Sequence, residues 1–329
     1  MRRYELVGRR DLALRDVPVP QPGPGEVLIR VGACTICNRS DLVYYHYLGE
    51  RDHCAQGFFG HEVSGTVEAV GAGVTRTEPG ARVFARAPLS GGYADFALVR
   101  EISVGHLPDQ IPFEQGAILQ LLPLAVHATR GVRLGDRVAV IGQGPVGLMT
   151  LQVLARRGAS DIVVADLDPW RLERSRALGA HRTVQTDDAA REDWSALGGE
   201  FDVAIDAVGT PYTANACVGL VRHNGLVVLL GTHHVDTHVT FDLVAWEKKG
   251  LRIHTSAEPT DPDRAAAMKV AERLAPGIEL APLLSQAYPL ERLPEAIERL
   301  SASSVLDPAE SPRAQAGPPP RTLKLAIVP

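Results

Sequence analysis

Cysteine is scarce in this sequence of 329 residues, which contains only Cys34, Cys37, Cys54 and Cys217. Their small number and uneven spacing are unlike the dense cysteine patterns that cross-link small secreted domains. The sequence therefore argues against a disulfide scaffold and favours a reducing compartment. In such a compartment the thiols are free to bind a metal ion.

Long apolar runs and an excess of basic residues are also absent. The longest apolar stretches, 117–126 and 146–155, are interrupted by glutamine and are shorter than the roughly 20 residues that cross a bilayer as a helix. No apolar segment follows the first three residues, so we expect no secretory signal and a cytoplasmic protein. The formal net charge of -5 gives no general attraction to nucleic acid or anionic lipid, and neither partner is expected.

The composition, 45% hydrophobic and 22% charged, is that of an ordinary globular protein. A chain of this length exceeds what one hydrophobic core usually serves, so two domains are expected. The first hundred residues carry short β-rich runs, such as 26–31 and 65–70, punctuated by glycine and proline. This punctuation is typical of a β-barrel or sandwich.

From residue 137 onward, strand-like apolar runs alternate with helical segments. We predict strands at 138–141 and 162–165 with a helix over 145–157 between them. This alternation favours a parallel, doubly wound sheet. The remaining elements predicted from pattern are strands at 203–205, 226–230, 251–254 and 323–328, and helices at 263–274 and 293–300.

The clearest motif is Gly142-Gln143-Gly144-Pro145-Val146-Gly147, which stands between a predicted strand and a predicted helix. In such a turn the first glycine permits the tight bend, the second lets the backbone approach a pyrophosphate, and the third lets the helix pack on the strand. The helix N-terminus then faces the phosphates. The motif predicts a dinucleotide site, although a glycine turn that binds nothing is the alternative.

The acidic residue Asp166 ends the next predicted strand. Its carboxylate can accept hydrogen bonds from an adenosine ribose and repels a 2′-phosphate, so NAD is predicted in preference to NADP. Arg171, five residues further on, offers a positive charge beside this position and is a second candidate contact for the cofactor.

A second constellation lies in the β-rich half, where Cys37 precedes Ser40-Asp41 and Gly60 precedes His61-Glu62. Thiolate, imidazole and carboxylate are ligand types that suit zinc, and a catalytic site needs three protein ligands and a water molecule. Each residue alone is more simply a core or surface residue. It is their combination that predicts a metal site.

The order of these motifs resembles that of the zinc-type medium-chain dehydrogenase/reductase family, the alcohol and polyol dehydrogenases. The resemblance covers nearly the whole chain and rests on Cys37, Ser40-Asp41, the glycine turn and the segments 22–27, 60–62, 70–74, 80–83, 92–96 and 323–325. It implies an α/β protein with a GroES-like β-rich catalytic domain, residues 1–122 and 256–329. The rest, 123–255, is implied to be an NAD-binding Rossmann domain with a doubly wound parallel sheet.

By this resemblance Cys37 and His61 are ligands of a catalytic Zn2+ ion, and Val208 and Leu230 line the cofactor. Ser40 would pass the proton of the alcohol toward solvent, or it would merely cap the turn that follows it. Relatives pair through their nucleotide domains, so a homodimer is implied by analogy.

The third metal ligand is left open, because Gln120 stands where family members commonly carry cysteine, glutamate or aspartate. A neutral amide is a weaker ligand than an anion. In some related polyol dehydrogenases the glutamate of the Gly-His-Glu motif reaches the metal, so Cys37, His61 and Glu62 with water form the alternative set. The sequence also has one extra residue between Cys37 and the serine-aspartate pair.

A second, structural zinc is not expected. The cysteine-rich lobe that holds it in the family would lie between residues 83 and 91, where this sequence has no cysteine.

We therefore predict an NAD-dependent oxidoreductase that oxidises a secondary alcohol of a sugar, cyclitol or related polyol to a ketone by zinc-assisted hydride transfer. The polar and aromatic cluster formed by 44–47 and 51–53 suits a polyhydroxylated substrate, or else anchors a loop on the core. Two other functions stay open. One is a metal-free NAD(P)H-dependent reductase of an activated double bond, and the other is a non-catalytic nucleotide-sensing protein.

Overall fold

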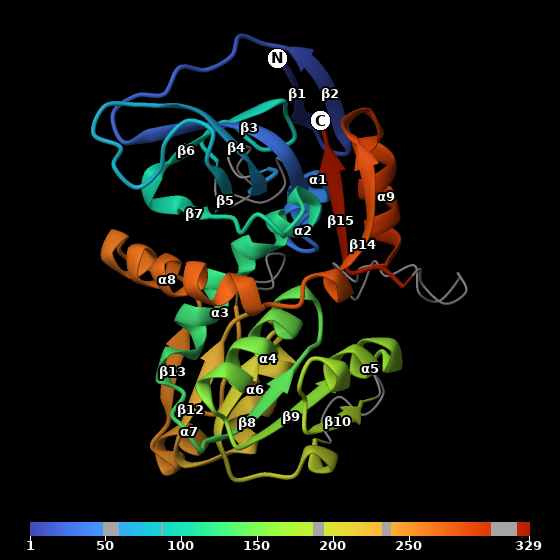
Figure 1. Ribbon diagram of the computed structural model, residues 1–329. Helices are drawn as coiled ribbons and strands as arrows, with labels where there is room; N and C mark the ends of the chain where they lie inside the picture. Colours follow the sequence, from blue (N-terminus) through green and yellow to red (C-terminus); the bar gives the residue numbers. More distant parts are fainter. Residues whose placement is uncertain (49–58, 87, 187–193, 232–237, 304–320) are drawn as a thin grey trace. The chain divides into compact units, whose positions relative to one another are not determined.

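The computed structural model describes residues 1–48, 59–86, 88–186, 194–231, 238–303 and 321–329 (Figure 1). It divides the chain into two compact units, the first made of Met1–Gln120 with Thr260–Pro329 and the second of Leu121–Pro259. The sequence analysis assigned catalysis to 1–122 with 256–329 and NAD binding to 123–255. This assignment stays a prediction, because the two compact units alone do not identify the function of either part. Residues 51–53 of the expected substrate cluster and Cys54 lie outside the described residues.

The first unit is built on a seven-stranded sheet with the order β14-β15-β3-β4-β5-β7, in which β6 also pairs with β3. Its strands are β3 (Glu26–Thr35), β4 (Glu62–Val70), β5 (Arg82–Arg86), β6 (Phe96–Arg100), β7 (Val104–His106), β14 (Leu284–Pro289) and β15 (Lys324–Val328), beside a hairpin of β1 (Arg2–Gly8) and β2 (Asp11–Asp16). The helices of this unit are α1 (Ser40–Tyr47), α2 (Phe113–Gly116), α8 (Asp261–Leu274) and α9 (Leu293–Ser303). The β-rich architecture predicted for this half is confirmed.

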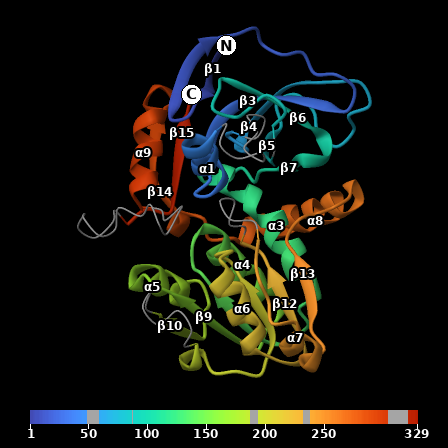
Figure 2. The same ribbon diagram turned by 180° about the vertical axis from the view of Figure 1, so that it is seen from behind.

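Strand register explains why distant parts of the first unit meet. The C-terminal strand β15 pairs with β3 so that Ala326 faces Thr35, and β3 pairs with β4 so that Thr35 faces Glu62. Three strands from the two ends of the sequence thus lie side by side, with α9 next to β14 and β15 in both views (Figures 1 and 2). The start of β15 therefore reaches the end of β3 and the start of β4.

The second unit contains a six-stranded parallel sheet with the order β10-β9-β8-β11-β12-β13. In chain order this is 3-2-1-4-5-6, the doubly wound arrangement that binds dinucleotides at the carboxyl ends of its strands. Its strands are β8 (Arg137–Ile141), β9 (Asp161–Asp166), β10 (Arg182–Gln185), β11 (Phe201–Asp206), β12 (Val221–Leu229) and β13 (Arg252–Thr255). Its helices are α3 (Leu121–Ala128), α4 (Pro145–Arg157), α5 (Pro169–Ala177), α6 (Pro211–Leu220) and α7 (Leu243–Lys249).

Local signals set the bounds of α4 where the sequence predicts them. Pro145 occupies the first turn, where its missing N–H is not needed, and Gly158 takes the left-handed conformation with φ of 78° at the C-terminus. The strand β10 was missed by the sequence analysis. Its residues are half-buried or exposed and form no apolar run, because it lies at the edge of the sheet.

Short 3-10 helices complete both units. They are η2 (Glu101–Ser103), η3 (Ala117–Gln120), η4 (Thr129–Gly131), η5 (Ser195–Leu197), η6 (Ala275–Gly277), η7 (Ala281–Leu283) and η8 (Leu290–Arg292). Among the described residues, no helix combines the length and the apolar character that a bilayer crossing requires.

The close approach of β3 and β4 generates the first prediction. A Cβ atom at Gly65 would lie 2.0 Å from the Arg30 carbonyl oxygen, so Gly65→Ala must push the two strands apart. We expect it to lower the free energy of unfolding by about 1–3 kcal/mol in chemical denaturation. Gly199→Ala is the control, because nothing lies within 4 Å of its Cβ position. Equal stability of the two variants would contradict this account of the sheet.

Candidate active site

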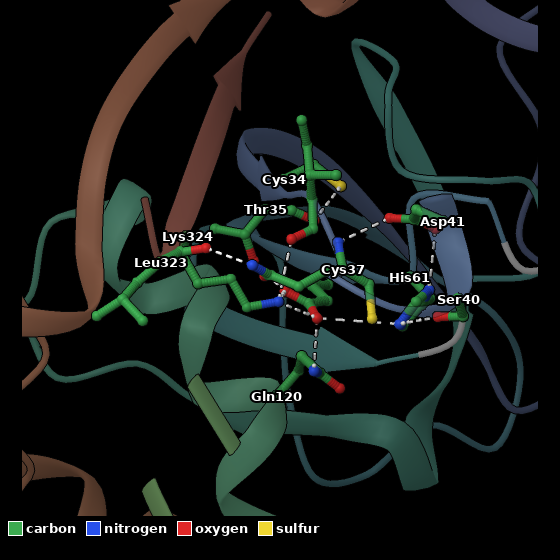
Figure 3. A network of polar contacts seen from close by, with 12 residues as sticks. Cys34, Thr35, Cys37, Ser40, Asp41, His61, Gln120, Leu323 and Lys324 are labelled. Carbon is green, nitrogen blue, oxygen red and sulfur yellow. Dashed lines mark hydrogen bonds and ion pairs between the residues drawn. The ribbon is translucent and has the colours of Figure 1, made fainter. Parts of the chain in front are cut away.

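Three potential metal ligands meet where β3 ends and β4 begins. Cys37 follows β3, His61 precedes β4, and Glu62 is the first residue of β4. One ligand atom from each lies within 4.8 Å of the others. Figure 3 shows the side chains of Cys37 and His61 directed toward each other. The predicted combination of thiol, imidazole and carboxylate is thus brought together in space.

The buried carboxylate of Asp41 organises this cluster. It accepts hydrogen bonds from the Cys37 backbone N–H at 2.9 Å, the Gly60 N–H at 3.1 Å and the Tyr93 hydroxyl at 2.6 Å. Its Oδ1 also lies 3.4 Å from Nδ1 of His61. Because Nδ1 faces Asp41, the other ring nitrogen, Nε2, is the one offered to a metal, as in carboxylate-histidine-metal sites.

The second ring nitrogen of His61, Nε2, lies near Ser40 and Glu62. It lies 3.4 Å from the Ser40 hydroxyl and 3.9 Å from Oε1 of Glu62. Ser40 is the first residue of α1, whose N-cap position is held by Arg39. Ser40 therefore does not occupy the N-cap position of α1, which was its alternative role.

The electrostatics of the cluster favour charged forms of the thiol and the ring. Burial acts to raise the pKa of Cys37, but His61 and Lys324 outweigh it and lower this pKa below its ordinary value. Burial acts to lower the pKa of His61, but Asp41 and Cys37 raise it well above its ordinary value. A divalent cation replaces the imidazole proton when it binds, because histidine ligates only in its neutral form.

Glu62 is held by an ion pair that the sequence analysis missed. Nζ of Lys324 lies 2.6 and 2.7 Å from its two carboxylate oxygens, with Glu62 0% and Lys324 2% exposed. The Thr35 hydroxyl donates to Oε2 of Glu62, and the side-chain amide of Gln120 donates to Oε1 at 3.0 Å. The only sequence signal was the Leu-Lys-Leu ending, which identified the family but not the partner of the lysine.

The donor set fits zinc. Sulfur, nitrogen and oxygen atoms at about 2.0–2.3 Å from a tetrahedral zinc lie roughly 3.3–3.8 Å from one another, so small side-chain adjustments close this cluster around one ion. The extra residue of the Cys37 loop does not prevent the arrangement. The Asn38 side chain ties that loop to the Leu323 carbonyl oxygen at 2.7 Å.

The aromatic residues of the expected substrate cluster that the structure describes are buried on α1. Tyr44, Tyr45, His46 and Tyr47 are each less than 10% exposed on α1. The Tyr45 hydroxyl donates to Glu298 at 2.7 Å. Burial and the neighbouring Glu298 carboxylate raise the pKa of Tyr45 to about 12. These contacts match the role of core anchors, which the sequence left as the alternative.

In the second unit, the glycine turn contains two glycines that close packing requires and one that borders open space. Gly142 has φ of 94°, and a Cβ atom there would meet Val208 at 2.5 Å. A Cβ at Gly147 would lie 2.0 Å from the Gly142 carbonyl oxygen, whereas one at Gly144 would meet nothing within 4 Å. Gly144 therefore borders open space, directly before Pro145 at the N-terminus of α4.

Asp166, at the end of β9, joins this turn to the next helix. Its carboxylate accepts the Gln143 N–H at 2.6 Å and the Asp168 N–H at 2.9 Å, and Nη1 of Arg171 lies 3.9 Å away. An ionised carboxylate has about four lone-pair sites, so acceptor capacity remains for ribose hydroxyls.

Asp206 has the same role at the end of β11 and was not singled out by the sequence analysis. Its side chain accepts the N–H groups of Val208 and Gly209 at 2.9 and 3.0 Å, and its backbone carbonyl oxygen accepts the Leu230 N–H at 2.9 Å. It thereby positions the two residues, Val208 and Leu230, that the family resemblance placed beside a cofactor. An acidic residue directly after the predicted strand 203–205 was the available signal.

Comparison with known proteins defines the class. Residues 23–109 match the alcohol dehydrogenase GroES-like domain, and residues 145–273 match the zinc-binding dehydrogenase family. Sorbitol dehydrogenase of Homo sapiens is 31% identical over 88% of this chain and 90% of its own, and that of Gallus gallus is 30% identical with the same coverage. The chain belongs to the zinc-binding, medium-chain dehydrogenase family.

Solved structures agree with this assignment. An alcohol dehydrogenase from Thermus sp. ATN1 matches with a TM-score of 0.77 and 26% identity, covering 100% of this chain and 99% of that one. A zinc-binding dehydrogenase from Sinorhizobium meliloti, bound to NADP, has the same fold with a TM-score of 0.80 at 23% identity, covering 100% and 99%. The predicted family and fold class are confirmed, and the predicted cofactors, zinc and a nicotinamide dinucleotide, agree with them.

The role of Asp41 can be tested without touching a ligand atom. Asp41→Asn keeps the shape but removes the charge behind His61, so we expect zinc affinity to fall about 10–100-fold in a competitive chelator titration. Asp202→Asn is the control, because Asp202 also accepts a backbone N–H, from Arg137 at 2.8 Å, in the other unit. The control should retain zinc, and unchanged affinity in Asp41→Asn would show that Asp41 does not orient His61.

A pair of glycine variants separates folding from nucleotide binding. Gly147→Ala should destabilise the turn by about 1–3 kcal/mol and lose NAD as well, because its Cβ would strike the Gly142 carbonyl oxygen. Gly144→Ala should leave thermal stability unchanged while weakening NAD binding at least about tenfold, measured by fluorescence titration. Normal NAD affinity in Gly144→Ala would exclude this turn as the pyrophosphate site.

Proposed function

We propose that this chain is an NAD-dependent, zinc-containing dehydrogenase that oxidises a secondary alcohol of a polyol, sugar or cyclitol to the ketone. The observation that carries the proposal is the meeting of Cys37 and His61, with Asp41 behind the ring, at the junction of β3 and β4. This is the arrangement that a catalytic zinc site requires, with ligands fixed by a buried carboxylate.

In this proposal Cys37 and His61 hold the ion, and Glu62 and Gln120 are the candidates for the third protein ligand. When bound, zinc supplies Lewis acidity that makes an alcohol hydroxyl easier to deprotonate. Ser40, whose hydroxyl lies 3.4 Å from the His61 ring, is placed to accept that proton. Asp41 keeps the ring in the orientation that leaves Nε2 available.

The nucleotide site of the proposal is the turn from Gly142 to Gly147 with Asp166. Gly144 leaves room for a pyrophosphate at the N-terminus of α4, with Pro145 and Val146 in the first turn of that helix. Asp166 offers acceptors to the ribose hydroxyls and repels a 2′-phosphate, which supports NAD. Arg171 weakens that repulsion only in part, since its guanidinium already faces Asp166 at 3.9 Å.

The substrate class rests on the relatives. Curated relatives include sorbitol dehydrogenases, and solved structures with the same fold include galactitol-1-phosphate dehydrogenase from Escherichia coli, with a TM-score of 0.78 and 20% identity over the whole of both chains. A small polyhydroxylated alcohol is therefore the substrate we propose. The homodimer and the cytoplasmic location stay proposals.

Replacement of a metal ligand tests this function. Cys37→Ala and His61→Ala should each lower turnover of a polyol panel with NAD by roughly a thousandfold or more, because several kcal/mol of charge stabilisation are lost. NAD affinity should survive, because the glycine turn lies in the other unit. Cys217→Ala, which removes a buried thiol from α6, serves as the control and should keep its activity.

Metal analysis completes the test. The wild-type protein should contain about one zinc per chain, and removal of the ion should abolish alcohol oxidation until zinc is returned. Full turnover by a zinc-free preparation, or by either ligand variant, would overturn the proposal.

A further inference from the structure

The side chain of Gln143, the second residue of the glycine turn, is 0% exposed. Its Nε2 donates to the Gly142 carbonyl oxygen at 2.9 Å, and its Oε1 accepts from the Ser175 hydroxyl on α5 at 3.0 Å. Ser175 is 0% exposed as well. Both ends of this amide therefore have partners away from solvent, and one of those partners lies on another helix.

The chemistry of the partners allows one orientation of the amide. A carbonyl oxygen only accepts hydrogen bonds, so the Gln143 nitrogen must face Gly142 and the Gln143 oxygen must face Ser175. The Ser175 hydroxyl then donates its single hydrogen to Gln143. The Arg171 carbonyl oxygen, 3.0 Å from the same hydroxyl, lies inside α5, where the helix supplies a backbone donor.

The backbone of Gln143 makes a second connection in the same direction. Its N–H donates to Oδ2 of Asp166 at 2.6 Å, while Oδ1 of Asp166 accepts the Asp168 N–H at 2.9 Å. Asp168 is the N-cap residue of α5 and accepts the Trp170 N–H at 2.9 Å. Gln143 is thus joined to β9 and α5 twice, through its main chain at Asp166 and through its side chain at Ser175.

These contacts fix the start of α4 as well as the carboxylate. A Cβ atom at Gly147 would lie 2.0 Å from the Gly142 carbonyl oxygen and 3.5 Å from Nε2 of Gln143. The amide therefore holds the carbonyl group on which the first turn of α4 packs. The expected pyrophosphate position, at the start of α4, and the expected ribose position, at Asp166, both depend on Gln143.

Packing alone does not account for an amide at this place. An apolar side chain of similar length would fill the same space without removing polar groups from water. Gln143 is too deeply buried to touch a nucleotide, whereas Asp166 is 9% exposed and Gly144 borders open space. Any effect of Gln143 on a nucleotide must pass through these two neighbours.

We propose that Gln143 is a positioning residue of the nucleotide site: hydrogen-bonded to Ser175, it holds the Asp166 carboxylate in a fixed place relative to the start of α4 and so contributes to the preference for NAD over NADP. A well-placed carboxylate accepts hydrogen bonds from the ribose hydroxyls of NAD and repels the 2′-phosphate of NADP. Displacing it weakens NAD binding more than NADP binding. The inference rests on the proposed function, because it requires a dinucleotide at the glycine turn.

Titration with NAD and with NADP, followed by fluorescence in the absence of an alcohol, tests the inference. Ser175→Ala removes the donor to Oε1 of Gln143, and Gln143→Met removes both amide contacts at about the same side-chain length. In each variant the ratio of the NADP Kd to the NAD Kd should fall at least about fivefold, the factor that one hydrogen bond of ordinary strength represents. Ser303→Ala is the matched control and should keep the wild-type ratio, because this buried serine of the other unit donates to the Leu300 carbonyl oxygen of its own helix at 2.8 Å.

A double-mutant cycle with Asp166 separates positioning from a general loss of packing. Asp166→Ala alone should lower the ratio, and adding Ser175→Ala should lower it no further, because the carboxylate to be positioned is gone. A general loosening of the unit would instead weaken both nucleotides alike and leave the ratio unchanged.

The outcomes distinguish the inference from the function beneath it. Melting temperatures identify the folded variants, and Ser175→Ala, which removes a single oxygen atom, keeps the test in place if Gln143→Met does not fold. A wild-type ratio in either folded variant, or a further full-sized drop when Ser175→Ala is added to Asp166→Ala, would overturn the inference. A wild-type protein that binds neither nucleotide, or that binds NADP more tightly than NAD, would instead reject the proposed function.

Discussion

The buried ion pair between Lys324 and Glu62 is the interaction on which the candidate metal site of the first unit depends. Removing both charges from water costs several kcal/mol per ion, and only close pairing with further hydrogen bonds offsets that cost. The pair exists because β15 returns from the far end of the sequence to lie against β3, which in turn lies against β4. Pairing of β15 with β3 therefore brings Lys324 to Glu62, so the C-terminal strand contributes a residue to the surroundings of the candidate metal site.

Buried aspartates hold loops in both units by accepting hydrogen bonds from backbone N–H groups. Asp41, Asp166 and Asp206 each accept backbone N–H groups that secondary structure leaves without partners at the end of a strand or the start of a turn. Hydrogen bonds to a charged acceptor are among the stronger ones in proteins, so each carboxylate fixes its loop. One loop then presents the candidate metal ligands and the others present the turns where a dinucleotide is expected. Rigid loops at the ends of strands allow a stable sheet to carry chemistry at its edge.

The predictive power of the sequence differed between elements for identifiable reasons. The helix α4 has its starting proline and closing glycine in the sequence itself, so both ends agree with the observed bounds. The edge strand β10 has no apolar run, because one of its sides lacks a neighbour, and periodicity could not find it. The aromatic residues of α1 suggested a sugar-binding surface, yet they are buried against the core. Residue type alone does not distinguish an aromatic anchor from an aromatic binding surface.

The sequence by itself determined the family, the two-part architecture, the glycine turn with Asp166, and the ligand types at Cys37 and His61. The glycine turn is local, since its residues are spaced closely enough for their pattern to carry the geometry, whereas the family and the two-part architecture follow from the length of the chain and the order of motifs along it. Only the tertiary structure decided what surrounds Glu62. Its partners Thr35, Gln120 and Lys324 come from three distant segments, and no local pattern records which cation will neutralise which anion. Charges buried in the same core must pair, but strand register, which emerges only when the whole sheet assembles, selects the partner.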